Sequence, residues 1–115
     1  MKIVIVDKII EKDELAALAE ENYEDMIKGV VDIRKEVVAL GGEMHADSEE
    51  ALLEKGSKQS DLWGFNILPD REKDNCIMYE SFINIRPRDN NRDIEVQRAD
   101  IKKKMKDIIF KRIEL

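Results

Sequence analysis

The stretch formed by residues 30–40, "VVDIRKEVVAL", constrains the fold more than any other part of the sequence, because two periodicities fit it. Apolar residues recur there at three- and four-residue steps, as in a helix that continues from the preceding segment: Val30, Ile33, Val37 and Leu40. The stretch also divides into two β-branched runs, residues 30–34 and 37–40, that could pair around a turn near Lys35 and Glu36. β-Branched residues favour strands, and Gly29 interrupts a continuing helix. We therefore predict a hairpin.

The N-terminal half offers three further elements. Residues 2–6, "KIVIV", predict a strand that is buried on both faces. A helix is expected to follow, with Asp13 as its N-cap and its end near Lys28 and Gly29. Its apolar stripe comprises Leu15, Leu18, Ala19, Tyr23 and Met26. After the hairpin, "DSEEALLEKGS" predicts a short helix that is capped by Asp47 or Ser48 and ended by Gly56.

The C-terminal half predicts two strands and a helix. The strands cover about residues 63–68 and 76–86, and each is stopped by a proline. The helix covers about residues 98–113 and carries an isoleucine-rich face opposite a row of lysines. The order strand, helix, hairpin, short helix, hairpin, helix predicts an α+β fold. We expect a single mixed or mostly antiparallel sheet of about five strands, with the helices packed on one face, in one domain spanning residues 1–115.

Composition and charge exclude several classes of protein. An apolar fraction of 43% argues against disorder, and no stretch approaches the length of a membrane span. Cys76 is the only cysteine, so an internal disulfide is impossible and a reducing cytoplasm is expected. The net charge of −6 disfavours loose binding to nucleic acid. Ten basic residues against five acids in residues 86–112 nevertheless give that segment +5 and leave −11 elsewhere.

Three separated segments resemble a family of uncharacterised bacterial and archaeal proteins that share a domain of unknown function. They are "VVDIRKEVVALGGEMHADSE", "DLWGFNILP", and "INIRP" followed by "NNR", and together they extend from Val30 to Arg92. The resemblance supports the hairpin, since such proteins look to have a turn glycine where this chain has Glu36. The resemblance brings no activity with it, and the cofactor is unknown.

The only histidine, His45, lies in "GGEMHADSEE" between Glu43 and Asp47. In an extended chain these three side chains would point the same way. They could then act as a general base with an orienting acid, or as three ligands of a divalent metal. The simpler interpretation is a Gly-Gly turn followed by a helix cap, with Glu43 and His45 solvated. A single histidine without paired cysteines argues against zinc.

Polar residues also interrupt the apolar strands. Asn66 lies between Phe65 and Ile67, while Asn84 and Arg86 fall on one face of the predicted strand at residues 76–86. Asp32 interrupts the hairpin in the same way. A buried amide without partners costs about 1–3 kcal/mol, so such positions face solvent, a pocket or a subunit contact. If this face carries a site, Asn66, Asn84 and Arg86 are its candidate substrate-binding residues.

The basic residues near the C-terminus have two interpretations. Arg86, Arg88 and Arg92 in "RPRDNNR" could bind phosphate or carboxylate, or could pair with local acids. The lysine row of the last helix could contact nucleic acid, but no aromatic residues are interleaved with it to stack on bases. A solvated amphipathic helix explains the lysines equally well.

Three functional hypotheses follow. The first is a ligand- or protein-binding module, homo-oligomeric, whose contact surface includes the mixed sheet face and the region of Trp63. The second is a small enzyme with an acid–base or metal site at Glu43, His45 and Asp47 that acts on an anionic substrate held by Arg86. The third is nucleic-acid binding through the last helix, which fails if its basic residues are scattered around acids.

Overall fold

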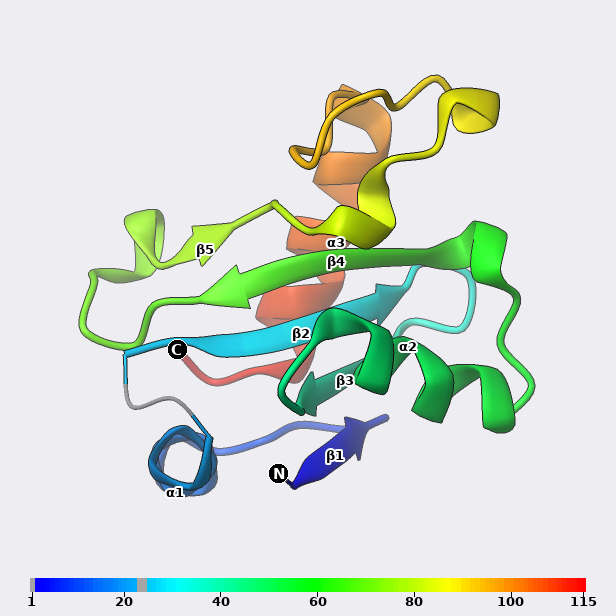
Figure 1. Ribbon diagram of the computed structural model, residues 1–115. Helices are drawn as coiled ribbons and strands as arrows, with labels where there is room; N and C mark the ends of the chain where they lie inside the picture. The colour runs from blue at the N-terminus through cyan, green and yellow to red at the C-terminus, as the bar shows by residue number, and fades with distance from the viewer. Residues whose placement is uncertain (1, 23–24) are drawn as a thin grey trace.

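The computed structural model describes residues 2–22 and 25–115, and its central feature is a five-stranded antiparallel sheet. Its spatial order is β1-β3-β2-β4-β5, with β1 (Ile3–Val6), β2 (Ile27–Asp32), β3 (Val37–Gly41), β4 (Leu62–Ile67) and β5 (Ile77–Met78). The helices of this part of the chain are α1 (Lys12–Glu21), α2 (His45–Glu54) and α3 (Ala99–Arg112) (Figure 1). The predicted α+β class with a five-stranded, mostly antiparallel sheet is confirmed.

The predicted hairpin is confirmed as β2 and β3, and Asp32 holds its turn. One carboxylate oxygen of Asp32 accepts hydrogen bonds from the backbone N–H groups of Arg34 and Lys35, both at 2.9 Å. The other accepts from the Ser57 hydroxyl at 2.6 Å. Glu36 closes the turn with a φ of 58°, a left-handed conformation that glycine adopts more easily. The buried acid is therefore a structural part of the hairpin.

Helices cover both faces of the sheet rather than the one face that we predicted. On one side Val31, Trp63 and Phe65 pack with buried residues of α1 and α3. On the other side Val30 packs with Leu52 of α2. The central strand β2 is apolar on both faces, and such a strand needs cover on both sides. Figure 1 shows α2 in front of the sheet and α3 behind it.

The first strand and the first helix differ from the prediction. β1 is an edge strand rather than one buried on both faces, and its Ile5 is 36% exposed. Helix α1 begins before Asp13 and ends at Glu21, where the side-chain amide of Asn22 donates to the carbonyl of Leu18. Gly29, expected at the helix end, lies inside β2. There the Phe65 ring occupies the space that a Cβ on Gly29 would need. Tyr23 of the predicted stripe lies outside the described residues.

The long strand predicted at residues 76–86 is wrong, because only Ile77 and Met78 pair as a strand, in β5. Residues 82–84 form a 3₁₀ turn that begins at Ser81. The Asn84 side chain then takes the place of a neighbouring strand beside β4. Its Oδ1 accepts from the N–H of Gly64 at 2.8 Å, and its Nδ2 donates to the Gly64 carbonyl at 3.0 Å. The predicted strand at 63–68 and helix at 98–113 are present as β4 and α3.

Candidate functional site

The three residues of the histidine segment do not converge. Helix α2 begins at His45, so the chain is not extended there, and the alternation that would align Glu43, His45 and Asp47 does not apply. Asp47 instead accepts from the backbone N–H of Met44 at 3.0 Å and closes the first turn of the helix. Glu43 and Asp47 line one surface depression, whereas His45 lines a different cavity. The N-cap of α2 is therefore Met44, and not Asp47 or Ser48 as predicted. The backbone N–H of Asp47 donates in turn to the carbonyl of Met44 at 3.0 Å.

Among the described residues, no group of three or more His, Cys, Asp or Glu side chains could hold a metal ion. The three-ligand interpretation of Glu43, His45 and Asp47 therefore has no geometric basis in the part of the chain that the structure describes.

His45 faces the sheet. Its ring Nε2 lies 2.8 Å from the carbonyl oxygen of Phe65 in β4, and Asn66, the next residue of that strand, lies beside the ring. Since a carbonyl only accepts, Nε2 carries the proton and Nδ1 has the lone pair in the neutral ring. Burial is the main reason that the pKa of His45 lies below its ordinary value of 6.5. The contact with Phe65 opposes this shift, the positive charge of Lys28 adds to it, and Asn66 opposes it again.

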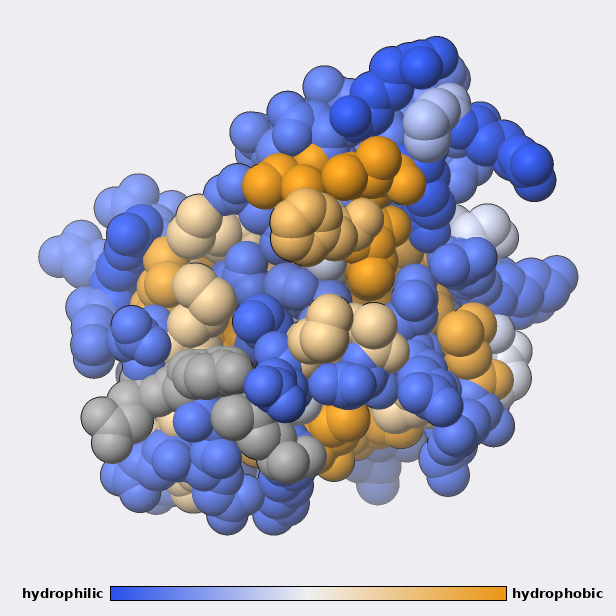
Figure 2. All heavy atoms as spheres, in the orientation of Figure 1, coloured by the Kyte–Doolittle hydropathy of each residue, from blue (hydrophilic) through white to orange (hydrophobic). Residues whose placement is uncertain are grey.

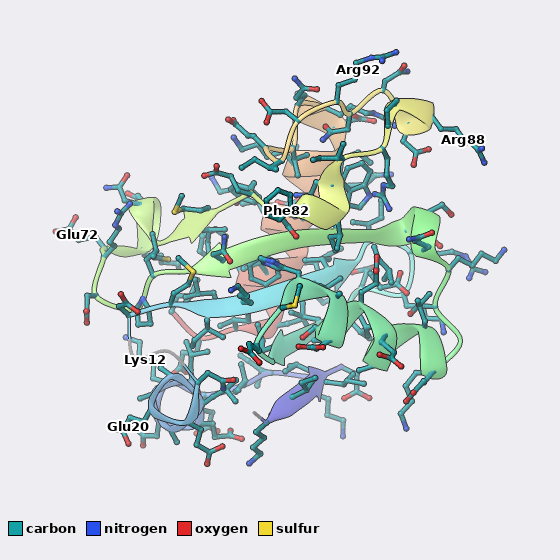
Figure 3. All side chains as sticks on the ribbon, in the orientation of Figure 1. Lys12, Glu20, Glu72, Phe82, Arg88 and Arg92 are labelled. Atoms are coloured by element: carbon teal, nitrogen blue, oxygen red, sulfur yellow. The ribbon has the colours of Figure 1, made fainter. Side chains whose placement is uncertain are left out.

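A cavity of about 430 Å³ opens beside His45, between α2 and the segment that follows β5. Its floor is the face of β2 and β4 that α2 leaves uncovered. Three of the chain's five methionines line it, together with Phe82, which is 83% exposed at its edge. Figure 3 labels Phe82 in front of β4, and Figure 2 shows apolar side chains gathered there. The lining residues are Met26, Lys28, Met44, His45, Ala46, Asn66, Met78, Glu80, Ser81, Phe82, Ile83 and Ile94.

Two charged side chains belong to the cavity's lining, Lys28 from β2 and Glu80 from the segment after β5. The ammonium group of Lys28 donates to the backbone carbonyl of Glu43 at 3.1 Å, which joins the sheet to the turn before α2. One positive and one negative group leave the lining with no strong net charge.

Of the three candidate substrate-binding residues, only Asn66 joins His45. Asn84 is fully buried against Gly64 and has a structural role. Arg86 lies over the ring of Trp63, with its guanidinium carbon 3.8 Å from the ring centroid, and donates to the carbonyl of Gln59 at 2.6 Å. Burial lowers the pKa of Arg86 from its ordinary value. Trp63 itself is 1% exposed, so it is a core residue and no part of a contact surface.

The sequence of this chain matches the model of a protein family over residues 4–112, and the family is described as "Protein of unknown function (DUF5674)". The chain belongs to DUF5674. This match confirms the resemblance to a domain of unknown function that the three segments suggested. No curated protein and no solved structure matches the chain. Membership of DUF5674 carries no activity with it, so the function must be argued from the site.

Several basic residues near the C-terminus of this DUF5674 protein pair with acids, which gives the hypothesis of nucleic-acid binding less support. In α3, Lys103 pairs with Asp107 at 3.0 Å and Lys111 with Glu36 at 3.1 Å. Before the helix, Arg98 pairs with Asp100 at 2.8 Å. These ion pairs place acids among the basic residues of α3 and of the segment before it, whereas a nucleic-acid surface needs a continuous positive face. Within residues 2–22 and 25–115, no helix is long and apolar enough to cross a membrane.

Sequence reasoning missed most of the cavity. Met26 was assigned to a helix stripe, and Met78 and Phe82 to alternating positions of a long strand. Methionine is a flexible side chain that is enriched on adaptable binding surfaces, so its recurrence near His45 was an available signal. Nothing in the sequence indicated that the lining residues meet, because they come from five separate segments of the chain.

Proposed function

We propose that this protein is a small-ligand-binding module and that the cavity beside His45 is its binding site. The observation that carries the proposal is the combination of apolar walls with two convergent polar groups, His45 and Asn66, at one place on the floor. Small-molecule sites are typically concave and mostly apolar, with a few polar groups that fix the orientation of the ligand. A volume of about 430 Å³ falls within their usual range of about 300–1,000 Å³.

The lining itself favours a binding role over a structural one. A residue needed only for the core would be packed on all sides, as Phe65 is on the opposite face of the same strand. Met44 is instead 61% exposed at the edge of the cavity. Exposed apolar side chains around a cavity are a feature of surfaces that a second molecule covers. The predicted anionic ligand has less support, because Arg86 lies away from the cavity, over Trp63.

A pair of helix-surface variants tests the proposal. Ala46 is exposed on α2 and lines the cavity, so Ala46→Trp would fill its opening without disturbing the core. Ala17 is equally exposed on α1, outside this lining, so Ala17→Trp is the matched control. We expect fragments from a small-molecule library to shift the NMR signals of His45 and of Met26, Met44 and Met78. Ala46→Trp should abolish these shifts and Ala17→Trp should retain them. Equal binding by both variants would contradict the proposal.

Acid–base catalysis is the second candidate, and one observation favours it. His45 is held with its unprotonated Nδ1 available, because Nε2 donates to the Phe65 carbonyl at 2.8 Å. This carbonyl does the orienting that Glu43 or Asp47 was expected to do. A neutral imidazole beside an apolar cavity is suited to removing a proton from a bound molecule. Turnover of a bound fragment that disappears in His45→Gln while binding persists would support catalysis. Binding without turnover would contradict catalysis and would still agree with the ligand-binding proposal.

We also propose that a second copy of the chain covers the apolar surface around the cavity. Phe82, at the edge of the cavity, is 83% exposed, and an exposed apolar side chain beside a cavity suits a surface that a second copy covers. Sedimentation velocity over a range of concentrations tests this. Phe82→Ser should weaken self-association, and Ile9→Ser, at a position that is 54% exposed in another part of the chain, should not. A wild-type chain that stays monomeric at every concentration would overturn the oligomer.

A further inference from the structure

The orientation of the Asn66 amide follows from the hydrogen bond that its nitrogen makes to Glu80. Asn66 is 7% exposed, and its Nδ2 donates to the backbone carbonyl of Glu80 at 3.1 Å. Because a carbonyl cannot donate, the nitrogen must face Glu80 and the oxygen must point the other way. That oxygen, Oδ1, is buried and has no hydrogen-bond partner among the residues that the structure describes. A native fold rarely leaves a buried acceptor unsatisfied without a reason.

His45 contributes a second acceptor to the same floor. Its Nε2 is committed to the Phe65 carbonyl, so the neutral ring presents Nδ1 as a lone pair. The ring is attached to the first residue of α2, and Asn66 comes from β4, so two separate elements bring these acceptors to one cavity.

We infer that the ligand of this cavity is an uncharged molecule with an apolar body and a hydrogen-bond donor, an O–H or an N–H, that is directed at Asn66 Oδ1 and His45 Nδ1. The inference rests on the proposed binding function and adds the chemical class of the ligand. The body lies against the methionines and Ile94, and the donor bonds to one of the two acceptors on the floor or is shared between them. The fold places acceptors there, and a donor is the group that matches them.

Charged ligands fit this floor less well. A carboxylate or phosphate would bring further acceptors against Oδ1 and Nδ1, and neither atom can donate to it. An ammonium group could donate, but it would lose its hydration among the apolar walls. The Lys28 charge, after burial and the Phe65 contact, is among the influences on the pKa of His45, which it lowers. Burial and Lys28 thus keep the imidazole neutral and able to accept.

Four aromatic probes of matched size separate these possibilities. Benzyl alcohol carries a donor, and its isomer anisole has the same atoms but no donor. Benzoate carries a negative charge and benzylammonium a positive one. Dissociation constants for the wild-type protein would be measured by NMR, from the shifts of the His45 ring and the methionine methyl groups. Because an unmet buried acceptor weakens binding, we expect benzyl alcohol to bind on the order of tenfold more tightly than anisole. Both ions should bind more weakly than benzyl alcohol.

Asn66→Leu removes the acceptor and tests its role directly. In this variant the advantage of benzyl alcohol over anisole should shrink severalfold, and fluorescence of the buried Trp63 reports whether the fold is retained. If the variant does not fold, the wild-type ratio of the two isomers decides alone. Equal binding of benzyl alcohol and anisole by the wild-type protein would overturn the donor inference and leave the binding module intact. Tighter binding of either ion would overturn it in favour of charge recognition. If no probe binds, or if Ala46→Trp binds them all as the wild type does, the proposed function itself fails.

Discussion

Substituting Asn84 by alanine should destabilise the protein more than almost any other single polar change. The side chain is fully buried and makes three hydrogen bonds: it accepts from the N–H of Gly64 and donates to the carbonyls of Gly64 and Ile94. At a net contribution of about 1 kcal/mol each, these bonds supply about 3 kcal/mol. Leaving the polar backbone of Gly64 without partners raises the cost of Asn84→Ala to about 3–5 kcal/mol.

Urea unfolding followed by fluorescence measures this cost. Trp63 is the only tryptophan in the chain and is 1% exposed, so its emission reports loss of the core. With a urea m-value of about 1–3 kcal/mol per M, the midpoint for Asn84→Ala should fall by at least about 1 M. Asn75 is exposed and its side chain makes no hydrogen bond within the described part of the chain, so Asn75→Ala is the matched control. A change as small as that of the control would refute the claim that Asn84 replaces a strand beside β4.

Three further predictions concern the core and the cavity. The pKa of His45 should lie below 6.5 in an NMR titration. The unfolded state then binds the proton better, so stability should be lost as the pH falls below about 6.5, less steeply in His45→Gln. Cys76 is 2% exposed and burial raises its pKa, so a thiol reagent should react with it only at the rate of unfolding. Gly64→Ala should cost about 1–3 kcal/mol in urea unfolding, because the added Cβ would clash with the Ser81 side chain. A thiol that reacts at once with folded protein, or a Gly64→Ala variant as stable as wild type, would contradict these accounts.

The parts of the fold that were predicted correctly depend on local chemistry. The hairpin followed from β-branched residues on either side of a polar turn, and β2 and β3 pair there with Val31 opposite Val38. Helix α3 followed from its isoleucine spacing, and its buried residues are those of the predicted face. In both segments the residues that define the pattern also make the packing contacts, so composition and periodicity were sufficient.

The parts that were missed depend on contacts between distant residues. Residues 76–86 alternate as a strand does, yet the backbone leaves the sheet after Met78 because the Asn84 side chain bonds to Gly64 in its place. No local pattern reveals that an amide substitutes for a strand. The helices were assigned to one face because a second apolar face was not recognised in β2, where Val30 and Val31 are both fully buried.

The histidine segment was misjudged for a different reason. Alternation places Glu43, His45 and Asp47 on one side only if the chain is extended, and the helix begins at His45. Asp47 was weighed as the residue that begins the helix, but it closes the first turn by reaching back to the N–H of Met44. The helix therefore begins three residues earlier than it would with Asp47 as its N-cap. With this earlier start, His45 lies in the first turn of the helix and faces β4, away from both carboxylates. The sequence singled out His45, but the structure places it beside Asn66 and away from the cavity that Glu43 and Asp47 line.

Asn66 and Asn84 look alike in the sequence, because each lies between two apolar residues. They differ in how completely the fold satisfies the polar atoms of their side chains. Every polar atom of the Asn84 side chain has a partner in the fold, so its burial is explained by what it holds together. The Asn66 amide donates to Glu80, and its buried oxygen has no partner among the described residues. The hydrogen bond to Glu80 gives the amide nitrogen a structural role, but it gives no reason for leaving the buried oxygen without a partner. The unsatisfied oxygen, and not the mere presence of an asparagine in a strand, is the observation on which we propose Asn66 as a ligand-binding residue.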